Sequence, residues 1–434
     1  MTAELFAVFF TSITFALACT RFLPKFTSAE TKPQRLRLSG KPTKSSRLPL
    51  IGGPGIIASL VIGYFFLQDQ NELILNLLLI TSAFMMCGLL DDVLKTRGKG
   101  LSERTTMIVA IAASIVAASI VNTDTVSNSP FSFAYWIDYD ALVWVIYVCL
   151  FLFITVSTGI SDGVDGLTTG LGLISLAAIL GASMLIGTDY LPAAVALIAI
   201  AGFMPLNLPS KWRPGLSKGR MAISYLGDSG ALAIGAMITT TAIISEVEIM
   251  LPIIAGALIL EGLSSVVQAK ILVPICRRIT SLGGPQKESI HHSYFPLPFI
   301  ATPIHHHVEL IGIDRLSLVF LFWTLGILCA FITLIIVAVN SWVSIIYFAA
   351  GISMTILFWG ILSLFRPSYL VATRLNEHLV TVSRFQGKPK SICNRVVESA
   401  TCTTDYFDLL NIPTDTKLNH EVAREIMATV RDGS

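Results

Sequence analysis

Four clusters of polar and charged residues interrupt an otherwise apolar chain, and their side chains are of the types that handle phosphate groups. The clusters are Leu90–Lys95, Asp162–Gly166, Tyr225–Asp228 and Pro303–His307. Carboxylates and histidines are costly to keep at the depth of a bilayer, so such residues in apolar surroundings are functional candidates. Paired carboxylates, further aspartates and a run of histidines together predict a metal-assisted site for a phosphorylated substrate.

The aspartates of the first and third clusters each allow two interpretations. Asp91 and Asp92 are adjacent, and Lys95 follows one helical turn later. Two neighbouring carboxylates stay ionised only beside a cation or base, which suits a catalytic dyad but also an interfacial salt bridge that ends an apolar helix. Asp228 stands before an apolar run and either binds a cation or caps the helix that follows.

The second and fourth clusters favour loops. The two glycines of Asp162–Gly166 allow a tight turn with exposed backbone amides at the start of a helix, which suits either a nucleotide or plain helix capping. The three histidines of Pro303–His307 cannot all face one metal ion from a regular helix, so a zinc triad is not expected. In a loop, these histidines are suited to donate hydrogen bonds to phosphate.

The composition predicts an all-α, polytopic helical membrane protein. The 434 residues are 53% hydrophobic and 13% charged, with a mean hydropathy of +0.73, whereas soluble proteins carry about 25% charged residues. Apolar runs near the length of a membrane-spanning helix recur along most of the chain. The predicted spans are 3–22, 51–67, 73–90, 105–121, 141–158, 167–187, 191–207, 230–245, 249–273, 316–339 and 342–364.

These spans divide the chain into three expected parts. Residues 1–340 form a transmembrane core with active-site loops, 341–365 an extra transmembrane helix, and 366–434 a tail of soluble composition. Within the tail, residues 419–432 are predicted to be helical.

The positive charges all fall on one side of this topology. The 30 Lys and Arg residues lie in or beside the loops after the first, third, seventh and ninth spans and in the tail. The opposite loops contain acids such as Asp69 and Glu248 and no base. The positive-inside rule then predicts that the active-site loops of this multi-pass protein are cytoplasmic and that its N-terminus is external. The expected location is the inner (plasma) membrane.

Together, the four clusters resemble those of the phospho-N-acetylmuramoyl-pentapeptide transferase family, within the polyprenyl-phosphate N-acetylhexosamine-1-phosphate transferase superfamily. The superfamily's Leu-Asp-Asp motif with a downstream Lys is matched by Leu90–Lys95, and its Asp-Gly-x-Asp-Gly-Leu motif by Asp162–Leu167. Its Gly-Asp motif with a preceding aromatic residue is matched by Tyr225–Asp228. The histidine run Thr302–Leu310 is similar to one specific to the muramoyl-pentapeptide branch, as are Glu261, Ser264 and Gln268.

The resemblance implies a fold of about ten membrane helices, to which the last predicted span is an addition, and a reaction. The enzyme would transfer phospho-N-acetylmuramoyl-pentapeptide from its UDP carrier to undecaprenyl phosphate, giving lipid I and UMP in peptidoglycan synthesis. Mg²⁺ is the implied cofactor, because two anions must be brought together. Asp91, Asp92 and Asp228 are the implied catalytic residues, and Asp228 is the implied metal ligand.

The same resemblance implies which residues bind the substrates. Lys95 would contact the diphosphate, Asp162 and Asp165 the nucleoside, and Tyr225 would stack on uracil. The full expected set is Lys95, Asp162, Gly163, Asp165, Asn207, Tyr225, Gln268, His305, His306 and His307.

The chain also departs from the family pattern. Val156 and Gly159 stand where the family has asparagines, and the family's glycine-rich loop is reduced to Arg47–Gly53. If the enzyme is active, other polar groups are expected to replace the asparagines. The candidates are the hydroxyls of Thr155, Ser157, Thr158 and Ser161, or the bases Lys211, Arg213, Lys218 and Arg220.

Two alternatives remain open at this level. One is a transferase of the same superfamily that uses UDP-GlcNAc or a related sugar; the other is a non-catalytic paralogue that binds a lipid phosphate. The expected partners are UDP-MurNAc-pentapeptide, undecaprenyl phosphate and membrane lipid, with no nucleic acid. A homodimer is an arrangement that the sequence leaves open.

Overall fold

The computed structural model describes the larger part of the chain, in two compact units. The described residues are 28–30, 47–49, 52–66, 72–96, 100–121, 127–208, 222, 224–275, 298–299, 301–310, 313, 315–339, 368–374, 379–386, 395–403 and 417–418. The first unit comprises Met1–Arg35, Pro42–Gly262 and Arg315–Thr355, and the second comprises Leu36–Lys41, Leu263–Asp314 and Ile356–Ser434.

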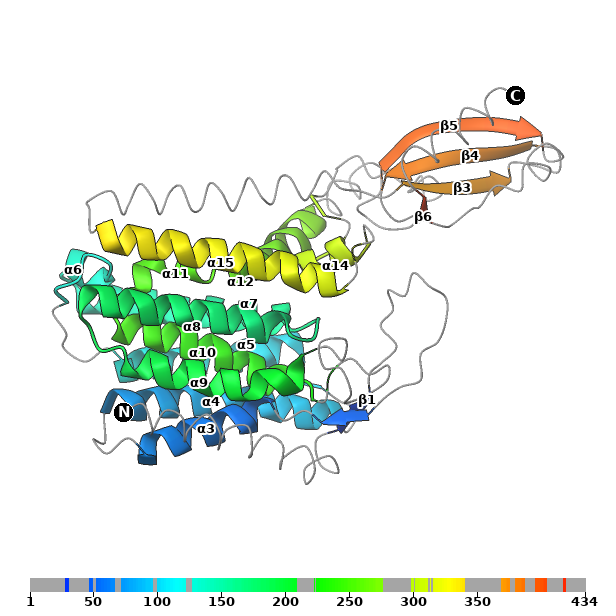
Figure 1. Cartoon of the computed structure of the whole chain (residues 1–434). Coiled ribbons are helices and arrows are strands. Elements are labelled where there is room, and N and C mark those ends of the chain that lie inside the picture. Colours follow the sequence, from blue (N-terminus) through cyan, green and yellow to red (C-terminus); the bar gives the residue numbers. More distant parts are fainter. Residues whose placement is uncertain are drawn as a thin grey trace. The chain divides into compact units, whose positions relative to one another are not determined.

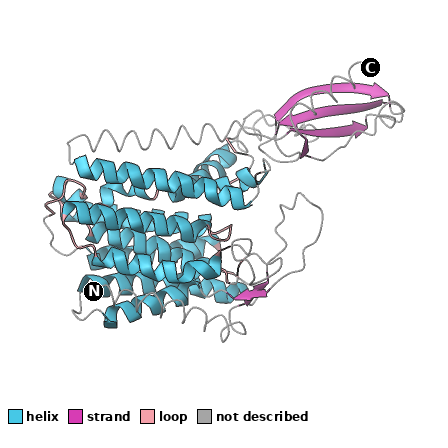
Figure 2. Cartoon of the chain, viewed as in Figure 1, coloured by secondary structure: helices cyan, strands magenta, loops and turns pink. Residues whose placement is uncertain are grey.

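The first unit is a bundle of long apolar helices (Figures 1 and 2). Its helices are α3 (Gly52–Phe66), α4 (Glu72–Thr96), α5 (Glu103–Val121), α6 (Phe133–Trp136), α7 (Asp140–Ser161), α8 (Leu167–Ile186), α9 (Leu191–Asn207), α10 (Gly227–Ile244), η2 (Glu248–Met250), α11 (Leu251–Ile254), most of α12 (Gly256–Ser265) and α15 (Arg315–Val339). In the described part of the chain, seven helices are long and apolar enough to cross a membrane. In its membrane helices the protein is therefore an all-α, integral membrane protein, as predicted.

The predicted spans agree with these helices within a few residues at most ends. The described helices cover nine of the eleven predicted spans, while the predicted spans 3–22 and 342–364 and the predicted tail helix 419–432 lie outside the described residues. The predicted span 249–273 is interrupted: α11 ends at Ile254, α12 begins at Gly256, and the helix continues as the π-helical segment η3 (Val266–Leu272). The break at Ala255 leaves no signal in hydropathy, because Ala255 and its neighbours are apolar or small.

Among the described helices that are long and apolar enough to cross a membrane, α10 is the most enclosed, with 83% of its residues buried. It packs against α3, α4, α7 and α8. Its sequence explains this position, because glycines and alanines let neighbouring helix backbones approach closely. At Gly235, for example, an added Cβ would overlap Thr158 and the backbone of Thr155 on α7.

A hydrophobic cluster lies where α4, α5, α7 and α10 meet. Phe84 of α4 and Phe151 of α7 are fully buried and stack with ring centroids 6.0 Å apart. Ala117 of α5 and Ala236 of α10 fill the space beside these rings. This packing fixes the relative position of α4 and α10 about two turns from the ends that carry the aspartates.

Strands occur outside the helix bundle. A short antiparallel pair joins β1 (Ser28–Glu30) to β2 (Arg47–Pro49). The second unit contains a four-stranded antiparallel sheet in the order β5-β4-β3-β6, formed by β3 (Ser368–Arg374), β4 (Leu379–Gln386), β5 (Arg395–Thr403) and β6 (Lys417–Leu418). The composition of the tail predicted a soluble segment but not this sheet. The second unit also contains the end of α12, η3 and α14 (Ile304–Leu310).

Candidate active site

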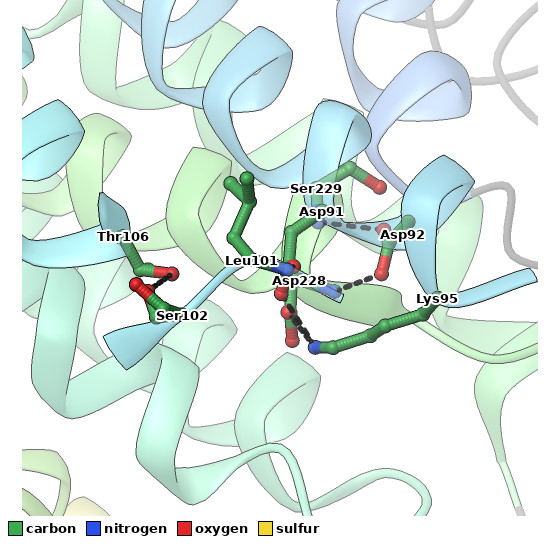
Figure 3. A network of polar contacts seen from close by, with 8 residues as sticks. All are labelled: Asp91, Asp92, Lys95, Leu101, Ser102, Thr106, Asp228 and Ser229. Atoms are coloured by element: carbon green, nitrogen blue, oxygen red, sulfur yellow. Dashed lines mark hydrogen bonds and ion pairs between the residues drawn. The ribbon is translucent and has the colours of Figure 1, made fainter. Parts of the chain in front are cut away.

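The aspartate motifs of α4 and α10 meet where the end of one helix touches the start of the other (Figure 3). Gly88 of α4 makes this approach possible, because an added Cβ there would overlap the backbone of Asp228 and Ser229. One turn later, the buried Asp92 faces the start of α10. Its Oδ1 accepts a hydrogen bond from the backbone N–H of Asp228 at 3.1 Å, and its Oδ2 accepts one from Ser229 at 2.9 Å.

Asp92 therefore caps α10 from another helix. The first N–H groups of a helix lack partners within it, and a carboxylate at this end is stabilised by the helix dipole as well. Asp162, in the turn after α7, accepts a hydrogen bond from the backbone N–H of Gly227. Gly227 has a φ of 71°, in the left-handed region that glycine adopts without strain. Two carboxylates from distant segments thus bind three consecutive amides at the start of α10.

The electrostatics around Asp162 are unfavourable for a charged carboxylate. Burial, first, and then the neighbouring carboxylates of Asp228, Asp165 and Asp92 raise the pKa of Asp162 well above its usual range. The hydrogen bond from Gly227 opposes this shift. The site therefore concentrates negative charge, which favours a bound cation.

Asp91 and Lys95 complete the cluster beside Asp228. Lys95 Nζ lies 2.7 Å from Asp91 Oδ2 and also forms an ion pair with Asp228. Asp91 Oδ1 accepts a hydrogen bond from the backbone N–H of Leu101 at 2.6 Å, which ties α4 to the start of α5. The side chain of Asp228 is 34% exposed, so it remains accessible to a ligand, whereas Asp92 is 3% exposed.

A second group of residues holds the Asp-Gly turn between α7 and α8. Asn207, at the end of α9, is buried, and its Oδ1 accepts hydrogen bonds from the N–H of Gly166 at 3.0 Å and from Thr169 Oγ1 at 2.6 Å. Its Nδ2 donates to the carbonyl of Ser224 at 3.3 Å. Asn207 was expected to bind substrate, but both its amide oxygen and its amide nitrogen form hydrogen bonds within the protein and hold the turn in place.

Tyr225 and Asp165 lie near one another on this side of the site. Tyr225 is half-buried. Burial, first, and then the negative charge of Asp165 raise the pKa of Tyr225 to about 12, so its hydroxyl stays protonated at physiological pH. Gly163, also expected to bind substrate, donates its backbone N–H to the carbonyl of Ser161 at 2.8 Å within the turn.

The reduced glycine-rich segment before α3 also bears on the site. An added Cβ at Gly52 would overlap the backbone of Leu226, and one at Gly53 would overlap Ser229 and Met85. The two glycines kept from the family's longer loop are therefore the ones that let α3 start against the start of α10.

The remaining predicted site residues belong to the second unit. Gln268 is buried in η3 and pairs with both backbone groups of Phe299: its Nε2 donates to the carbonyl at 2.9 Å, and its Oε1 accepts from the N–H at 2.8 Å. The histidines lie on the short helix α14 and not in a loop, which corrects the expected conformation. His305 and His307 are buried there, and His306 Nδ1 lies 3.5 Å from Glu309 Oε2. The site at the start of α10 is formed by residues of the first unit.

The hydroxyls next to Val156 and Gly159 are directed into the protein. Thr155, Thr158 and Ser161 are buried and donate to carbonyls of their own helix, at 2.6, 2.8 and 2.9 Å. Ser157 is buried against the backbone of α12 at Gly262, where an added Cβ would overlap its Oγ. These contacts do not support hydroxyl groups as replacements for the family's asparagines. The bases of 211–220 lie outside the described residues.

Gly88 and Leu101 also contribute to the site, although they were not predicted from the sequence. Gly88 lies one turn before Asp92 in an apolar helix, and an isolated glycine in such a position is a signal of close helix packing. Leu101 acts through its backbone amide, which no sequence pattern reveals.

The donor set suits a divalent cation that shares its coordination with substrate. Among the residues that the structure describes, no three His, Cys, Asp or Glu side chains converge to hold a metal ion. Mg²⁺ commonly takes only one or two carboxylates from the protein and fills its shell with water and substrate phosphates. The partly exposed carboxylate of Asp228, beside that of Asp91, fits that pattern.

Comparisons with known proteins agree with this chemistry. Residues 74–246 match the family model described as glycosyl transferase family 4, a range that contains both aspartate motifs and Asp228. Phospho-N-acetylmuramoyl-pentapeptide-transferase of Staphylococcus saprophyticus is 27% identical over 322 residues, covering 70% of this chain and 88% of that protein. The protein of the same name from Staphylococcus epidermidis is 28% identical over 322 residues, covering 70% of this chain and 88% of that protein. The one from Halalkalibacterium halodurans is 27% identical over 304 residues, covering 67% of this chain and 84% of that protein.

The matched family, the long apolar helices and the carboxylate cluster lead to one conclusion. The chain is a membrane-embedded phospho-sugar transferase, of which residues 74–246 match glycosyl transferase family 4 and which is similar to phospho-N-acetylmuramoyl-pentapeptide transferases.

Proposed function

We propose that this enzyme transfers phospho-N-acetylmuramoyl-pentapeptide from its UDP carrier to undecaprenyl phosphate, forming lipid I and UMP. The observation that carries the proposal is the cluster at the α4–α10 junction, where Asp91, Lys95 and Asp228 meet beside the capping carboxylate of Asp92. A cluster of carboxylates with one lysine suits a reaction between two phosphate groups, because it can hold both a cation and an anion.

In the proposed reaction, an oxygen of the lipid phosphate forms a bond to the β-phosphorus of the UDP-sugar. The bond between that phosphorus and the bridging oxygen breaks, and UMP leaves with the electron pair. Lys95 donates to the diphosphate, and Asp91 orients the lipid phosphate or accepts its proton. When bound, Mg²⁺ neutralises charge on the phosphates, and Asp228 is its proposed protein ligand. The carboxylate oxygens of Asp92 are both engaged, so we assign it the positioning of Asp228.

The nucleoside is proposed to bind at the Asp-Gly turn. Tyr225 offers a half-buried aromatic ring for stacking on uracil, and Asp165, near its ring, offers carboxylate acceptors for ribose or base. Asp162 supports the turn through its bond to Gly227. For the histidines of α14, contact with the sugar or phosphate stays a prediction from the sequence.

The proposed location is the plasma membrane, with the site on the cytoplasmic face. The support is the distribution of Lys and Arg, which all fall on the side that carries the aspartate motifs. UDP-linked precursors are cytoplasmic compounds, so this orientation also matches the proposed substrate.

The test is an assay on the full chain in lipid nanodiscs that contain undecaprenyl phosphate. UDP-MurNAc-pentapeptide and Mg²⁺ should give UMP and a lipid-linked product, and UDP-GlcNAc should not. Asp228→Asn should lower the rate by at least about 100-fold. Asp140→Asn is the matched control, because Asp140 is an exposed aspartate in the first turn of α7 and lies outside the cluster.

Each contrary result has a distinct meaning. Turnover of UDP-GlcNAc alone would replace the proposed substrate by another sugar of the same reaction class. Lipid-phosphate binding without any turnover would support a non-catalytic paralogue. A wild-type rate in Asp228→Asn would contradict the role of Asp228.

A further inference from the structure

The Asp162–Gly166 turn of the site is held by a side chain of α15, a helix that contains none of the predicted site residues. Trp323, on α15, donates its indole Nε1–H to the carbonyl oxygen of Gly166 at 3.2 Å. Gly166 has a φ of 82° and begins α8, and its own N–H is bound by Asn207. Both polar groups of the Gly166 residue are therefore held by side chains from other helices.

The path of α15 along α8 brings the indole to this place. An added Cβ at Gly170 would overlap Nε1, Cε2 and Cζ2 of Trp323, so the indole lies directly on the glycine backbone. Further along the same pair of helices, Gly326 of α15 packs against Leu171 and Gly181 of α8 packs against Leu334. Glycines at these contacts let the two helices approach closely, and the indole ring occupies the space left at Gly170.

The contacts then continue from the turn to the proposed metal ligand. The turn that Trp323 and Asn207 hold at Gly166 begins with Asp162. Asp162 accepts the N–H of Gly227, and the next amide, that of Asp228, is bound by Asp92. A shift of the turn would thus move one of the two carboxylates that define where α10 begins.

We propose that Trp323 is a positioning residue for the transfer reaction, which acts by fixing the Asp162–Gly166 turn and through it the start of α10. This inference rests on the proposed function. Trp323 touches no reacting group in it. Its contribution is the hydrogen bond to Gly166 and the packing on Gly170, both of which restrict how the turn can move.

Trp323→Phe tests the hydrogen bond, because phenylalanine keeps an aromatic ring but has no N–H. The matched control is Trp144→Phe on α7, which also removes an indole hydrogen bond, from Nε1 to Ser119 Oγ at 3.1 Å, but has no contact with the turn. Trp323→Phe should lower kcat by about tenfold, since a small misplacement of reacting groups has effects of this order. The KM for the UDP-sugar should change by less than twofold, and Trp144→Phe should change neither.

A second pair of variants tests the packing. Gly170→Ala adds a methyl group where the indole lies, so it should lower kcat in the wild-type background. In a Trp323→Leu background the ring atoms are gone, and the same Gly170→Ala change should have little further effect. Equal losses in both backgrounds would show that Gly170 acts independently of Trp323 and would overturn this part of the inference.

Amide hydrogen exchange provides a readout that does not depend on turnover. The peptide containing Gly227–Ser229 should exchange faster in Trp323→Phe than in Trp144→Phe. If the wild-type protein transfers no phospho-sugar, the proposed function fails, and the exchange comparison alone decides the inference. Identical exchange and identical kcat in the two tryptophan variants would overturn it.

Discussion

Asp92 binds Asp228 through the backbone: the carboxylate Oδ1 of Asp92, on α4, accepts the N–H of Asp228 at 3.1 Å, at the start of α10. The second oxygen of Asp92 binds the next amide. The adjacent Asp91 instead faces Lys95 and Asp228 with its side chain. The two neighbouring aspartates thus make different contacts: Asp92 caps the start of α10, and the side chain of Asp91 lies beside Lys95 and Asp228.

This difference predicts different outcomes for two parallel substitutions. Asp92→Asn keeps one oxygen acceptor but loses the other and the negative charge at the helix start, so the free energy of unfolding should fall by about 1–2 kcal/mol. Asp91→Asn removes a carboxylate that lies beside Asp228, so stability should be kept while turnover falls about 100-fold. Thermal unfolding in detergent and UMP release measure the two effects. Equal stabilities of the two variants would contradict the capping role.

The approach of α4 to α10 predicts that Gly88 tolerates no side chain. Gly88→Ala would force a methyl group into the backbone of Asp228 and Ser229, which should cost about 1–3 kcal/mol and displace the site. Gly159→Ala is the matched control, because an added Cβ there meets only Leu232 Cδ2 at 3.6 Å, an ordinary contact. The control should keep activity and gain about 0.5–1 kcal/mol from its higher helix propensity. Normal activity in Gly88→Ala would contradict the close approach.

The hydroxyls near Gly159 allow a further prediction about the missing asparagines. Thr158 and Ser161 donate to carbonyls of α7, and Ser161 also shares a hydrogen bond with Thr168 across the turn at 2.7 Å. Thr158→Val should therefore leave the KM for the UDP-sugar within twofold. A tenfold increase in KM would instead show that this hydroxyl reaches substrate. Gly159→Asn, which restores the family's residue type in a place with room for a side chain, should fold as stably as the wild type.

The sequence was sufficient for features that depend on local pattern. Helix spans follow from apolar runs, and Asp91, Asp92, Lys95 and Asp228 were expected to act together and do lie together. The different contacts of Asp91 and Asp92 were not predictable, because they depend on which of the two adjacent side chains faces Asp228, 136 residues after Asp92. Gln268 and Asn207 were expected to bind substrate, but their hydrogen bonds to backbone groups depend equally on distant segments.

A buried carboxylate predicts a pH effect on stability, and it lies near the ends of α7 and α10 that are far from the aspartate cluster. Glu248, in the connection between α10 and α11, is fully buried, and its Oε1 accepts hydrogen bonds from Ser132 Oγ at 2.6 Å, Phe133 N at 2.9 Å and Tyr147 Oη at 3.1 Å. Among the described residues, its Oε2 has no hydrogen-bond partner. Burial is the largest influence and raises the pKa of Glu248 to about 7, against the opposing effect of these donors.

The direction of the pH effect follows from this shift. The folded protein binds the proton of Glu248 more tightly than the unfolded chain does, so the stabilising contribution is complete below the ordinary pKa near 4.5 and is lost as the pH rises through about 7. The unfolding temperature in detergent should therefore fall between pH 5 and pH 7 in the wild type, and less steeply in Glu248→Gln. Glu246→Gln is the control, because Glu246 binds Ser127 Oγ at 2.6 Å from a partly exposed position. In Glu246→Gln the unfolding temperature should fall with pH as it does in the wild type. The same fall in Glu248→Gln would show that another group causes the pH dependence.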